Sequence, residues 1–444
     1  VYNDNMAERM PLTIAISTDG DQTYPHRRNV INKDGDTCAY PNALQTSDGK
    51  IHVIYTSERR TVINHIWFEE GAILGHTQET SAAANPQAAH VDQHVAVYDV
   101  DGRFGGWPAN HGIWQWGNEI LVGFGAGFYK NLGPNRHNID RDAPEYHMLG
   151  RSTDGGETWT LEHPGERGML VGSSGMRHGK LPTELKEPSP TDLAEAIDFT
   201  HPDFAMTIRM AHKDSGQSRF YYSYDRGHNW QGPFNLPQCG QIGISARTDY
   251  IINGPLDCML FLTATKTNGQ EGRVICLRTI DGGLSWEFVA NIGPEPAGYT
   301  IMPATVRLSD SDLLTTVRCR EGDASWIDAY VSHDNAASWS YLNRPEPDCG
   351  EGNPPAFIKL HDGRLCLTYG VRKEPFSMEA RLSSDNGTTW SEPIVLRNDG
   401  GGRDIGYPRS VQRPDGKIVT IYYFTPQTDP DRSIQATIWD PGTR

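Results

Sequence analysis

One short motif recurs along this chain of 444 residues and limits its fold more than any other feature. Each copy has Ser or Thr, an Asp two positions later, a turn of mostly small residues, and an aromatic residue five positions after the Asp. Asp accepts hydrogen bonds from nearby backbone N–H groups, Gly tolerates positive φ, and Trp has a large apolar face that must be buried. The motif therefore predicts a repeated tight turn between two strands. Its copies contain Asp154, Asp225, Asp281, Asp334 and Asp385, with a weaker copy at Asp19 that ends in Tyr24.

The spacing of the motifs predicts the architecture. From Asp225 onward the steps are 56, 53 and 51 residues, a period that suits one four-stranded blade. Segments typical of inner strands begin near residues 40, 111, 203, 248, 302, 355 and 407. We therefore expect an all-β fold, a seven-bladed β-propeller. In the six-bladed alternative, the N-terminal unit is an appendage or completes the last blade.

The blade units fill the whole chain in this interpretation. We expect one domain over residues 1–444, with an N-terminal blade unit at 1–69 and six further units at 93–444. Residues 70–110 and 162–200 carry few strand signals. The second of these stretches is expected to connect two blades close to a central funnel.

The repeated motifs are Asp boxes, and through them the chain resembles the sialidase-like (Asp-box or BNR-repeat) β-propeller superfamily over nearly its whole length. The resemblance implies that the boxes are structural turns on the outer parts of the blades. It also implies that chemistry takes place where the inner strands open onto the central funnel. A fold of this kind does not by itself identify a reaction.

Composition excludes several function classes. The net charge of −16 argues against nucleic acid or an anionic membrane as the main partner. No run of about 18 apolar residues is present, so we expect no membrane insertion. The seven cysteines have no metal-ligand spacing, and Cys258, Cys276, Cys319 and Cys366 lie in apolar strand patterns, which predicts buried free thiols. We expect no metal and no cofactor.

The ends of the chain suggest a location. No signal peptide is visible, but a start at Val1 is typical of a processed or trimmed chain. We therefore expect a secreted or periplasmic protein.

Arginines recur at one position of the blades. Arg209, Arg318, Arg320 and Arg372 lie near the far ends of predicted strands, and Arg318 and Arg320 share one strand face. Two further arginines, Arg247 and Arg409, begin inner strands. Because guanidinium groups bind carboxylates with a forked geometry, we interpret these six residues as a substrate-binding ring for an acidic sugar. In the alternative, each arginine neutralises an acid of its own blade.

Four titratable residues are predicted to be catalytic. His111 and Tyr407 stand at the mouths of inner strands, Glu351 precedes another, and Asp203 opens a fourth. A histidine at a strand mouth can act as a general base because its pKa lies near neutrality. His90 lies upstream of His111 and is predicted to join the substrate-binding residues.

Two chemistries fit these residues. Tyrosine with a carboxylate is the nucleophile and base of a retaining sialidase-like enzyme, whereas tyrosine with histidine and arginine suits a uronate lyase. The Arg-Ile-Pro motif of exo-sialidases is not present in the first blade. We expect a carbohydrate-active enzyme, a sialidase-like glycoside hydrolase that cleaves a bond to an acidic sugar of an oligo- or polysaccharide.

Two alternatives remain open. The first is a polysaccharide lyase or rhamnosidase-type enzyme that acts at rhamnose–glucuronate linkages. The second is a non-catalytic glycan-binding propeller, which predicts similar chemistry in every blade. Against the second, His111, Glu351 and Tyr407 each occur in a single blade.

Overall fold

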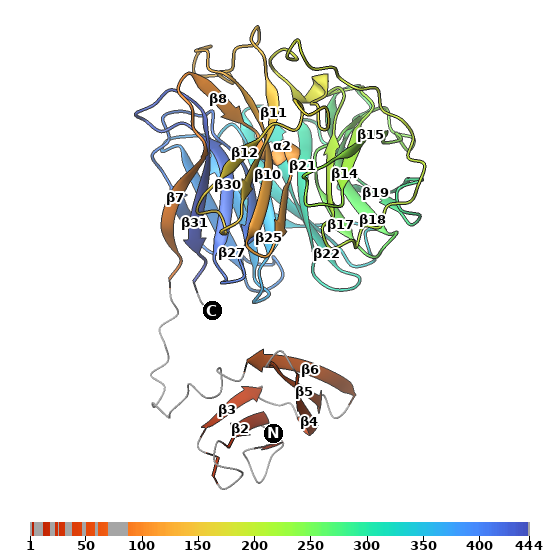
Figure 1. Ribbon diagram of the computed structural model, residues 1–444, viewed down its shortest axis with the longest axis vertical. Coiled ribbons are helices and arrows are strands. Elements are labelled where there is room, and N and C mark those ends of the chain that lie inside the picture. Colours follow the sequence, from red (N-terminus) through yellow and green to blue (C-terminus); the bar gives the residue numbers. More distant parts are fainter. Residues whose placement is uncertain are drawn as a thin grey trace. The chain divides into compact units, whose positions relative to one another are not determined.

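The computed structural model describes residues 2–3, 12–17, 23–24, 26–31, 38–46, 50–57, 61–69 and 88–442. The chain divides into two compact units, Val1–Gln87 and Ala88–Arg444. Both consist of antiparallel sheets (Figure 1). Helix within the described ranges is limited to α2 (Pro108–His111) and the 3-10 turn η2 (Ser174–Met176). The fold is all-β and propeller-like.

Six sheets follow one another along the second unit. The first contains β8 (Arg103–Gly106), β9 (Ile113–Trp116), β10 (Glu119–Phe128), β11 (Tyr146–Ser152) and β12 (Thr160–Glu162). The second contains β13 (Ala205–Arg209), β14 (Arg219–Ser223) and β15 (Gln231–Asn235). The third contains β16 (Ile244–Ser245), β17 (Tyr250–Ile252), β18 (Cys258–Thr265), β19 (Glu271–Thr279) and β20 (Glu287–Ile292).

The remaining three sheets have four strands each. The fourth contains β21 (Tyr299–Arg307), β22 (Leu313–Glu321), β23 (Ala324–Ser332) and β24 (Ser340–Glu346). The fifth contains β25 (Ala356–Lys359), β26 (Leu365–Val371), β27 (Ser377–Ser383) and β28 (Ile394–Arg397). The sixth contains β29 (Gly406–Gln412), β30 (Ile418–Phe424), β31 (Ser433–Asp440) and, as its fourth strand, β7 (His90–Tyr98).

Strand β7 joins the start of the second unit to its end. It pairs antiparallel with β31, so that Val95 lies opposite Ala436 (Figure 1). Both β7 and β8 fall inside residues 70–110, for which few strand signals were expected, and that expectation was wrong. The first part of β7 lies exposed on an outer edge and is mostly polar, so only residues 95–98 at its end carry an apolar strand pattern.

The first unit contains two three-stranded sheets. Strands β1 (Tyr2–Asn3), β2 (Leu12–Ile16) and β3 (His26–Ile31) form one, and β4 (Ala39–Gln45), β5 (Lys50–Ser57) and β6 (Val62–Glu69) form the other. In the second of these sheets, the pairing of β4 with β5 has the same pattern as the pairing of β29 with β30 in the sixth sheet of the other unit. Asn42 pairs with Ile54 as Arg409 pairs with Ile421, and both pairings follow a register shift.

The seven-blade count needs one blade from residues 1–69, and these residues form part of a separate compact unit. The six sheets of the second unit correspond to the predicted strand starts from residue 111 onward. Asp19, the centre of the weaker box, lies outside the described residues.

The five other Asp boxes lie between the last two strands of the first five sheets. In the first box, Ser152 Oγ accepts a hydrogen bond from the Gly156 N–H at 2.8 Å, and Asp154 Oδ1 accepts one from the Thr158 N–H at 3.0 Å. Burial alone would raise the pKa of Asp154, but the bonds from Thr158, Ser152 and Glu157 outweigh it and hold the pKa at about 2. The other four boxes repeat the bonds from the turn to Ser or Thr and to Asp.

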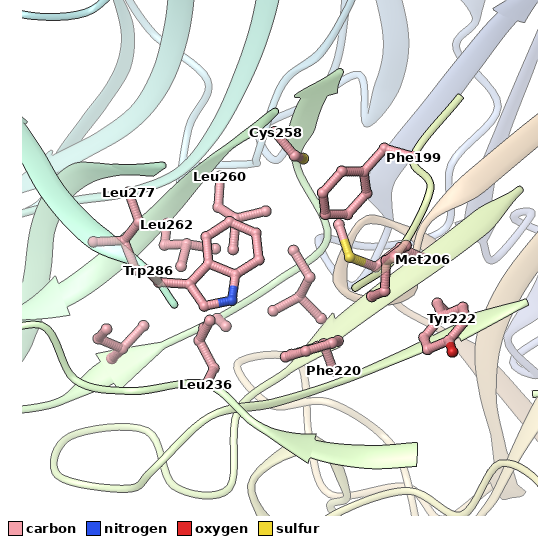
Figure 2. Close-up of a cluster of buried hydrophobic side chains, with 14 of the residues drawn as sticks. Phe199, Met206, Phe220, Tyr222, Leu236, Cys258, Leu260, Leu262, Leu277 and Trp286 are labelled. Carbon is pink, nitrogen blue, oxygen red and sulfur yellow. The ribbon is translucent and has the colours of Figure 1, made fainter. Parts of the chain in front are cut away.

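The box tryptophans help to join neighbouring sheets, as Figure 2 shows for one cluster. Trp286 follows β19 of the third sheet and packs with Phe220 of β14 in the second sheet. Leu260 and Leu277 belong to the same buried cluster. The predicted burial of Cys258, Cys276, Cys319 and Cys366 as free thiols is confirmed.

Candidate functional site

Side chains from along most of the second unit meet at a cavity of about 520 Å³, here called the Tyr407 cavity. They come from the ends of inner strands and from loops. Part of the 162–200 stretch, Ser174 to His178, contributes to the wall, whereas Leu193 of the same stretch packs on the hydrophobic core beside Trp286. The lining residues are Trp107, Asn110, His137, Ser174, Gly175, Arg177, His178, Met210, His212, Lys213, Asp214, Arg247, Gln270, Glu271, Tyr299, Ile301, Arg318 and Tyr407.

An unusual backbone conformation positions Tyr407. Its φ of 52° lies in the left-handed region, and the pairing of β29 with β30 shifts register beside it. The Asn353 side chain accepts a hydrogen bond from the Tyr407 N–H at 2.8 Å and donates one to the Ile405 carbonyl at 2.9 Å. A Cβ on Gly406 would lie 2.1 Å from Asn353, so this close approach requires glycine. Strain of this kind persists where the surroundings hold it, often at functional sites.

Two other residues of the second unit have the same left-handed backbone conformation before a proline. Trp107 and Met302 also precede a proline and have φ values of 61° and 53°. Trp107 lines the same cavity as Tyr407. At these three positions a large side chain in the left-handed region is followed by proline.

Arginines surround the Tyr407 ring. Arg318 Nη1 donates a hydrogen bond to the Tyr407 hydroxyl at 3.1 Å. The Arg372 guanidinium lies 5.4 Å from the ring centre. Burial would raise the pKa of Tyr407, but Arg318, Arg372 and Arg247 together lower it below its ordinary value of 10.0. The hydroxyl therefore ionises more readily than a free tyrosine.

Of the three arginines near the Tyr407 ring, Arg318 has a buried N–H group that donates no hydrogen bond to the described residues. Arg247 is bound to Glu271 at 2.5 Å, and Arg372 donates to the Ile405 carbonyl and the Tyr423 hydroxyl. By contrast, Nε of Arg318 is buried and has no hydrogen-bond partner in the described part of the chain. A buried unpaired donor on a cation is a strong site for an anion, because a bound carboxylate would relieve an unmet hydrogen bond.

Two carboxyl groups line the cavity. Besides its ion pair with Arg247, Glu271 is joined to Asp214, whose Oδ1 accepts a hydrogen bond from the Glu271 N–H at 3.0 Å. Lys213 lies 3.7 Å from Asp214. The cavity thus contains one carboxylate held by an arginine and a second beside an exposed lysine.

Aromatic rings form another wall. Trp107 packs on His178 with ring centres 4.3 Å apart and meets His137 edge-on at 5.2 Å. His137 binds Asp404 at 2.6 Å. Burial, with the nearby His137 and Arg141, lowers the pKa of His178 to about 3, so its ring is neutral at physiological pH. Trp107 is 1% exposed, so the neutral His178 ring is the part of this wall that can face a sugar.

Of the residues predicted from sequence, the structure brings Tyr407, Arg247 and Arg318 together in this cavity. Arg372 contacts the Tyr407 ring but lines a second cavity of about 720 Å³. Glu351 also lines that second cavity, where it forms an ion pair with Arg403 at 2.6 Å.

His111 and Arg209 lie elsewhere, in a buried cluster with His147. His111 is 1% exposed and its ring meets that of His147 at 4.6 Å, while Arg209 Nη1 bonds to His147 Nδ1. Burial lowers the pKa of both histidines well below 6.5. His111 is not among the residues that line the Tyr407 cavity, so the structure does not place it across a bound sugar from Tyr407.

The other predicted site residues are also outside the Tyr407 cavity. Asp203 is bound to Arg226 of a box turn at 2.6 Å, and His90 to Asp92 at 3.1 Å. Arg320 donates to the Gly322 carbonyl at 3.0 Å. Arg409 lines two other cavities and donates to the Ala109 carbonyl at 2.7 Å. The six arginines therefore do not form one ring.

Sequence reasoning missed most of the residues that line the cavity, and five of those missed bear on its chemistry. Two of them had a signal: Gly298-Tyr299 repeats Gly406-Tyr407, and Trp107-Pro108 repeats Tyr407-Pro408. The others are Asp214, Glu271 and His178, which lie in loops or at a strand end without a repeated pattern.

Two further features concern metals and membranes. Within the described residues, no group of three or more His, Cys, Asp or Glu side chains is arranged to hold a metal ion. No helix in that part of the chain is long and apolar enough to span a membrane.

Comparison with known proteins agrees with the sheets and boxes. Residues 204–420 match the BNR repeat-like domain. A protein of unknown function from Dyadobacter fermentans has a similar structure, with a TM-score of 0.60 at 20% identity over 80% of this chain and 100% of that one. The Hadza microbial sialidase Hz136 gives 0.53 at 12% identity over 87% and 73%. No curated protein sequence matches the chain.

A sialidase from Trypanosoma rangeli in complex with sialic acid gives a TM-score of 0.50 at 12% identity. The match covers 78% of this chain and 58% of that one. At such identities the likeness concerns the fold alone. Five Asp boxes at the same place in successive antiparallel sheets agree with this likeness. Residues 204–420 match the BNR repeat-like domain, and the chain as a whole is similar in fold to the sialidase-like, Asp-box β-propellers.

Proposed function

We propose that the Tyr407 cavity is the active site of a glycoside hydrolase that cleaves a bond to an acidic sugar in an oligo- or polysaccharide. One observation carries the proposal: the Tyr407 hydroxyl is bound by Arg318, whose Nε is an unused buried donor. A tyrosine with a lowered pKa is a better nucleophile or base near neutral pH. An arginine with a spare donor binds a carboxylate. A hydrolase of acidic sugars needs both groups side by side.

The proposed reaction keeps the configuration of the sugar. Arg318 binds the sugar carboxylate, and the Tyr407 oxygen attacks the anomeric carbon as the glycosidic bond breaks. Asp214 donates a proton to the leaving oxygen. Water then hydrolyses the glycosyl–tyrosine bond, with Asp214 accepting its proton. Glu271, fixed by Arg247 at 2.5 Å, receives the proton that Tyr407 loses.

A uronate lyase is the second candidate, and one observation favours it. The Arg318 guanidinium lies between two phenol rings, 5.5 Å from the centre of Tyr299 and 5.9 Å from that of Tyr407. An arginine that holds a uronate carboxylate would then have one phenol to remove the C5 proton and another to protonate the leaving oxygen.

Product analysis tests these proposals. Sialyl and glucuronyl oligosaccharides would be incubated with the protein, and the products examined for free acidic sugar and for unsaturated uronate. We expect a saturated acidic sugar with retained anomeric configuration. We expect Tyr407→Phe to lower kcat at least about a hundredfold with little change in KM, because the hydroxyl acts in the transition state.

Tyr299→Phe is the matched control. It removes a hydroxyl near the same arginine, and for the hydrolase we expect activity within about threefold of the native protein. A large loss in both variants together with an unsaturated product would favour the lyase. Full activity of Tyr407→Phe on a verified substrate would refute the assignment of Tyr407.

We also propose that the six sheets of the second unit form a closed six-bladed propeller. The inner segments contact one another in turn: Thr207 donates to the His111 carbonyl at 2.9 Å, and its hydroxyl lies 3.2 Å from that of Thr248. Arg409 of the sixth sheet donates to Ala109 beside the first. Strand β7 would lock the ring by completing the last blade.

A further inference from the structure

The second cavity noted above, here called the loop cavity, is larger than the Tyr407 cavity, at about 720 Å³. Four connecting segments form it together with Glu351. They are residues 129–138 of the first sheet's long loop, 372–376 after β26, 401–403 before β29, and 425–432 after β30. A cavity of this size lies in the range that holds small organic ligands.

The charges in the loop cavity are largely matched. Arg403 is bound to Glu351 at 2.6 Å, and Arg432 to Asp404 at 3.3 Å. Lys373 is bound to Asp348 at 2.5 Å. Arginines already paired in this way offer little net attraction to a further anion.

Apart from these ion pairs and the charged side chains of Arg372, Glu374 and Asp429, the lining consists of neutral polar groups and a few flat apolar faces. Amide and hydroxyl side chains come from Asn135, Gln427 and Thr428, and ring faces from Tyr129 and Phe376. Amides and hydroxyls both donate and accept hydrogen bonds, which matches a ligand rich in hydroxyl groups. This lining favours a neutral sugar.

The two cavities share a wall. Arg372 lines the loop cavity and lies 5.4 Å from the ring centre of Tyr407. At a second point, His137 lines the Tyr407 cavity and Asn138 the loop cavity, and Asp404 binds both of them, at 2.6 Å and 3.1 Å. The two cavities are therefore neighbours, separated by the side chains of Arg372 and Asp404.

We propose that the loop cavity is a binding subsite for the neutral sugars joined to the acidic sugar that is held beside Tyr407. This inference rests on the proposed function of the Tyr407 cavity. It identifies the substrate class as an oligosaccharide in which an acidic sugar is linked to neutral ones. A simple glycoside of the acidic sugar would leave the loop cavity empty and bind less tightly.

A substitution at Gly402 would block this subsite without disturbing the fold. Gly402 lines the loop cavity, and a Cβ placed on it meets no atom within 4 Å. Gly402→Trp should therefore fill the cavity with an indole ring. Gly254→Trp is the matched control, because Gly254 also has open space, with its nearest contact at 4.0 Å, and lies in the turn between β17 and β18.

Calorimetric titration would compare 3′-sialyllactose with N-acetylneuraminic acid, and a rhamnose–glucuronate oligosaccharide with D-glucuronic acid. In the native protein and Gly254→Trp, we expect the oligosaccharide of at least one pair to bind about tenfold or more tightly than its acidic monomer. In Gly402→Trp, we expect this advantage to disappear while monomer binding is unchanged.

Equal binding or no binding of both members in both pairs would overturn the subsite, and so would an advantage that persists in Gly402→Trp. Cleavage of the same oligosaccharides is measured separately. An oligosaccharide advantage without cleavage would reject the proposed hydrolase and keep the subsite.

Discussion

Burial gives some single residues of this protein unusual acid–base properties. Glu145 is 1% exposed, and its Oε2 accepts hydrogen bonds from the N–H groups of His178 and Gly179 at 2.7 and 2.6 Å. Its other oxygen, Oε1, is buried and has no hydrogen-bond partner among the residues that the structure describes. Burial therefore raises the pKa of Glu145 from 4.5 to about 7, in spite of the two hydrogen bonds. The same residue supports the His178 segment, which lines the Tyr407 cavity.

Glu145→Gln should make stability less dependent on pH. A carboxyl whose pKa is raised on folding contributes stability that is complete below its unfolded value of 4.5 and is lost as the pH rises through about 7. We expect the variant and the native protein to be similar near pH 4 and the variant to be more stable near pH 8, by about 1–3 kcal/mol. Urea unfolding across this pH range measures the difference. Glu321→Gln, at an exposed position, should show no such trend.

At the scale of elements, the Asp box is a self-contained turn. In the third sheet, Asp281 Oδ1 accepts hydrogen bonds from the Ser285 N–H at 3.0 Å and from Thr279 Oγ1 at 2.7 Å. The Trp286 side chain then packs on the second sheet. Each described box thus joins a local turn to the contact between two sheets, and none of the five described box aspartates lines the Tyr407 cavity.

Asp281→Ala should lower stability and leave activity unchanged. The change removes the acceptor for three hydrogen bonds of the turn, so we expect a loss of about 1–3 kcal/mol in the free energy of unfolding. Denaturant unfolding measures this loss, and KM on a verified substrate provides the functional check. A weaker KM with unchanged stability would contradict the structural role of the box.

At the scale of the whole molecule, the second unit depends on a strand from its own N-terminal end. Val97 and Tyr98 of β7 are buried against the rest of the unit. Without β7, the backbone edge of β31 would be open to solvent and to other chains. His94 of β7 and its hydrogen-bond partner Thr437 of β31 are 343 residues apart in the sequence. The pairing of β7 is therefore a property of the complete unit.

Fragments test this dependence. We expect residues 88–444 to unfold cooperatively at a temperature close to that of the corresponding transition in the whole chain, because they form a compact unit. We expect residues 100–444, which lack β7, to be less stable by about 3–5 kcal/mol through the loss of buried side chains. Scanning calorimetry and sedimentation of the two fragments provide the measurement. Equal stability of both would reject β7 as the closing strand.

The features that depend on residues close together in the sequence could be predicted from local patterns. The bonds of an Asp box join residues at most four positions apart, so the boxes could be predicted from residue types and spacing alone. The inner strands could be placed from the same repeats. The edge strand β7 could not be placed in this way, because its pairing partner β31 is at the other end of the unit.

The site needed the tertiary structure. Arg318 and Arg320 lie on one strand, but Arg318 reaches Tyr407, 89 positions away, whereas Arg320 near the strand end bonds to the Gly322 carbonyl. His111 has the sequence position of a catalytic residue, yet the packing of neighbouring sheets buries it against His147. The sequence determined that several arginines and a tyrosine stand at strand ends. Which of them share a cavity was decided by how the sheets pack, because the distances between sheets depend on side chains far apart in the chain.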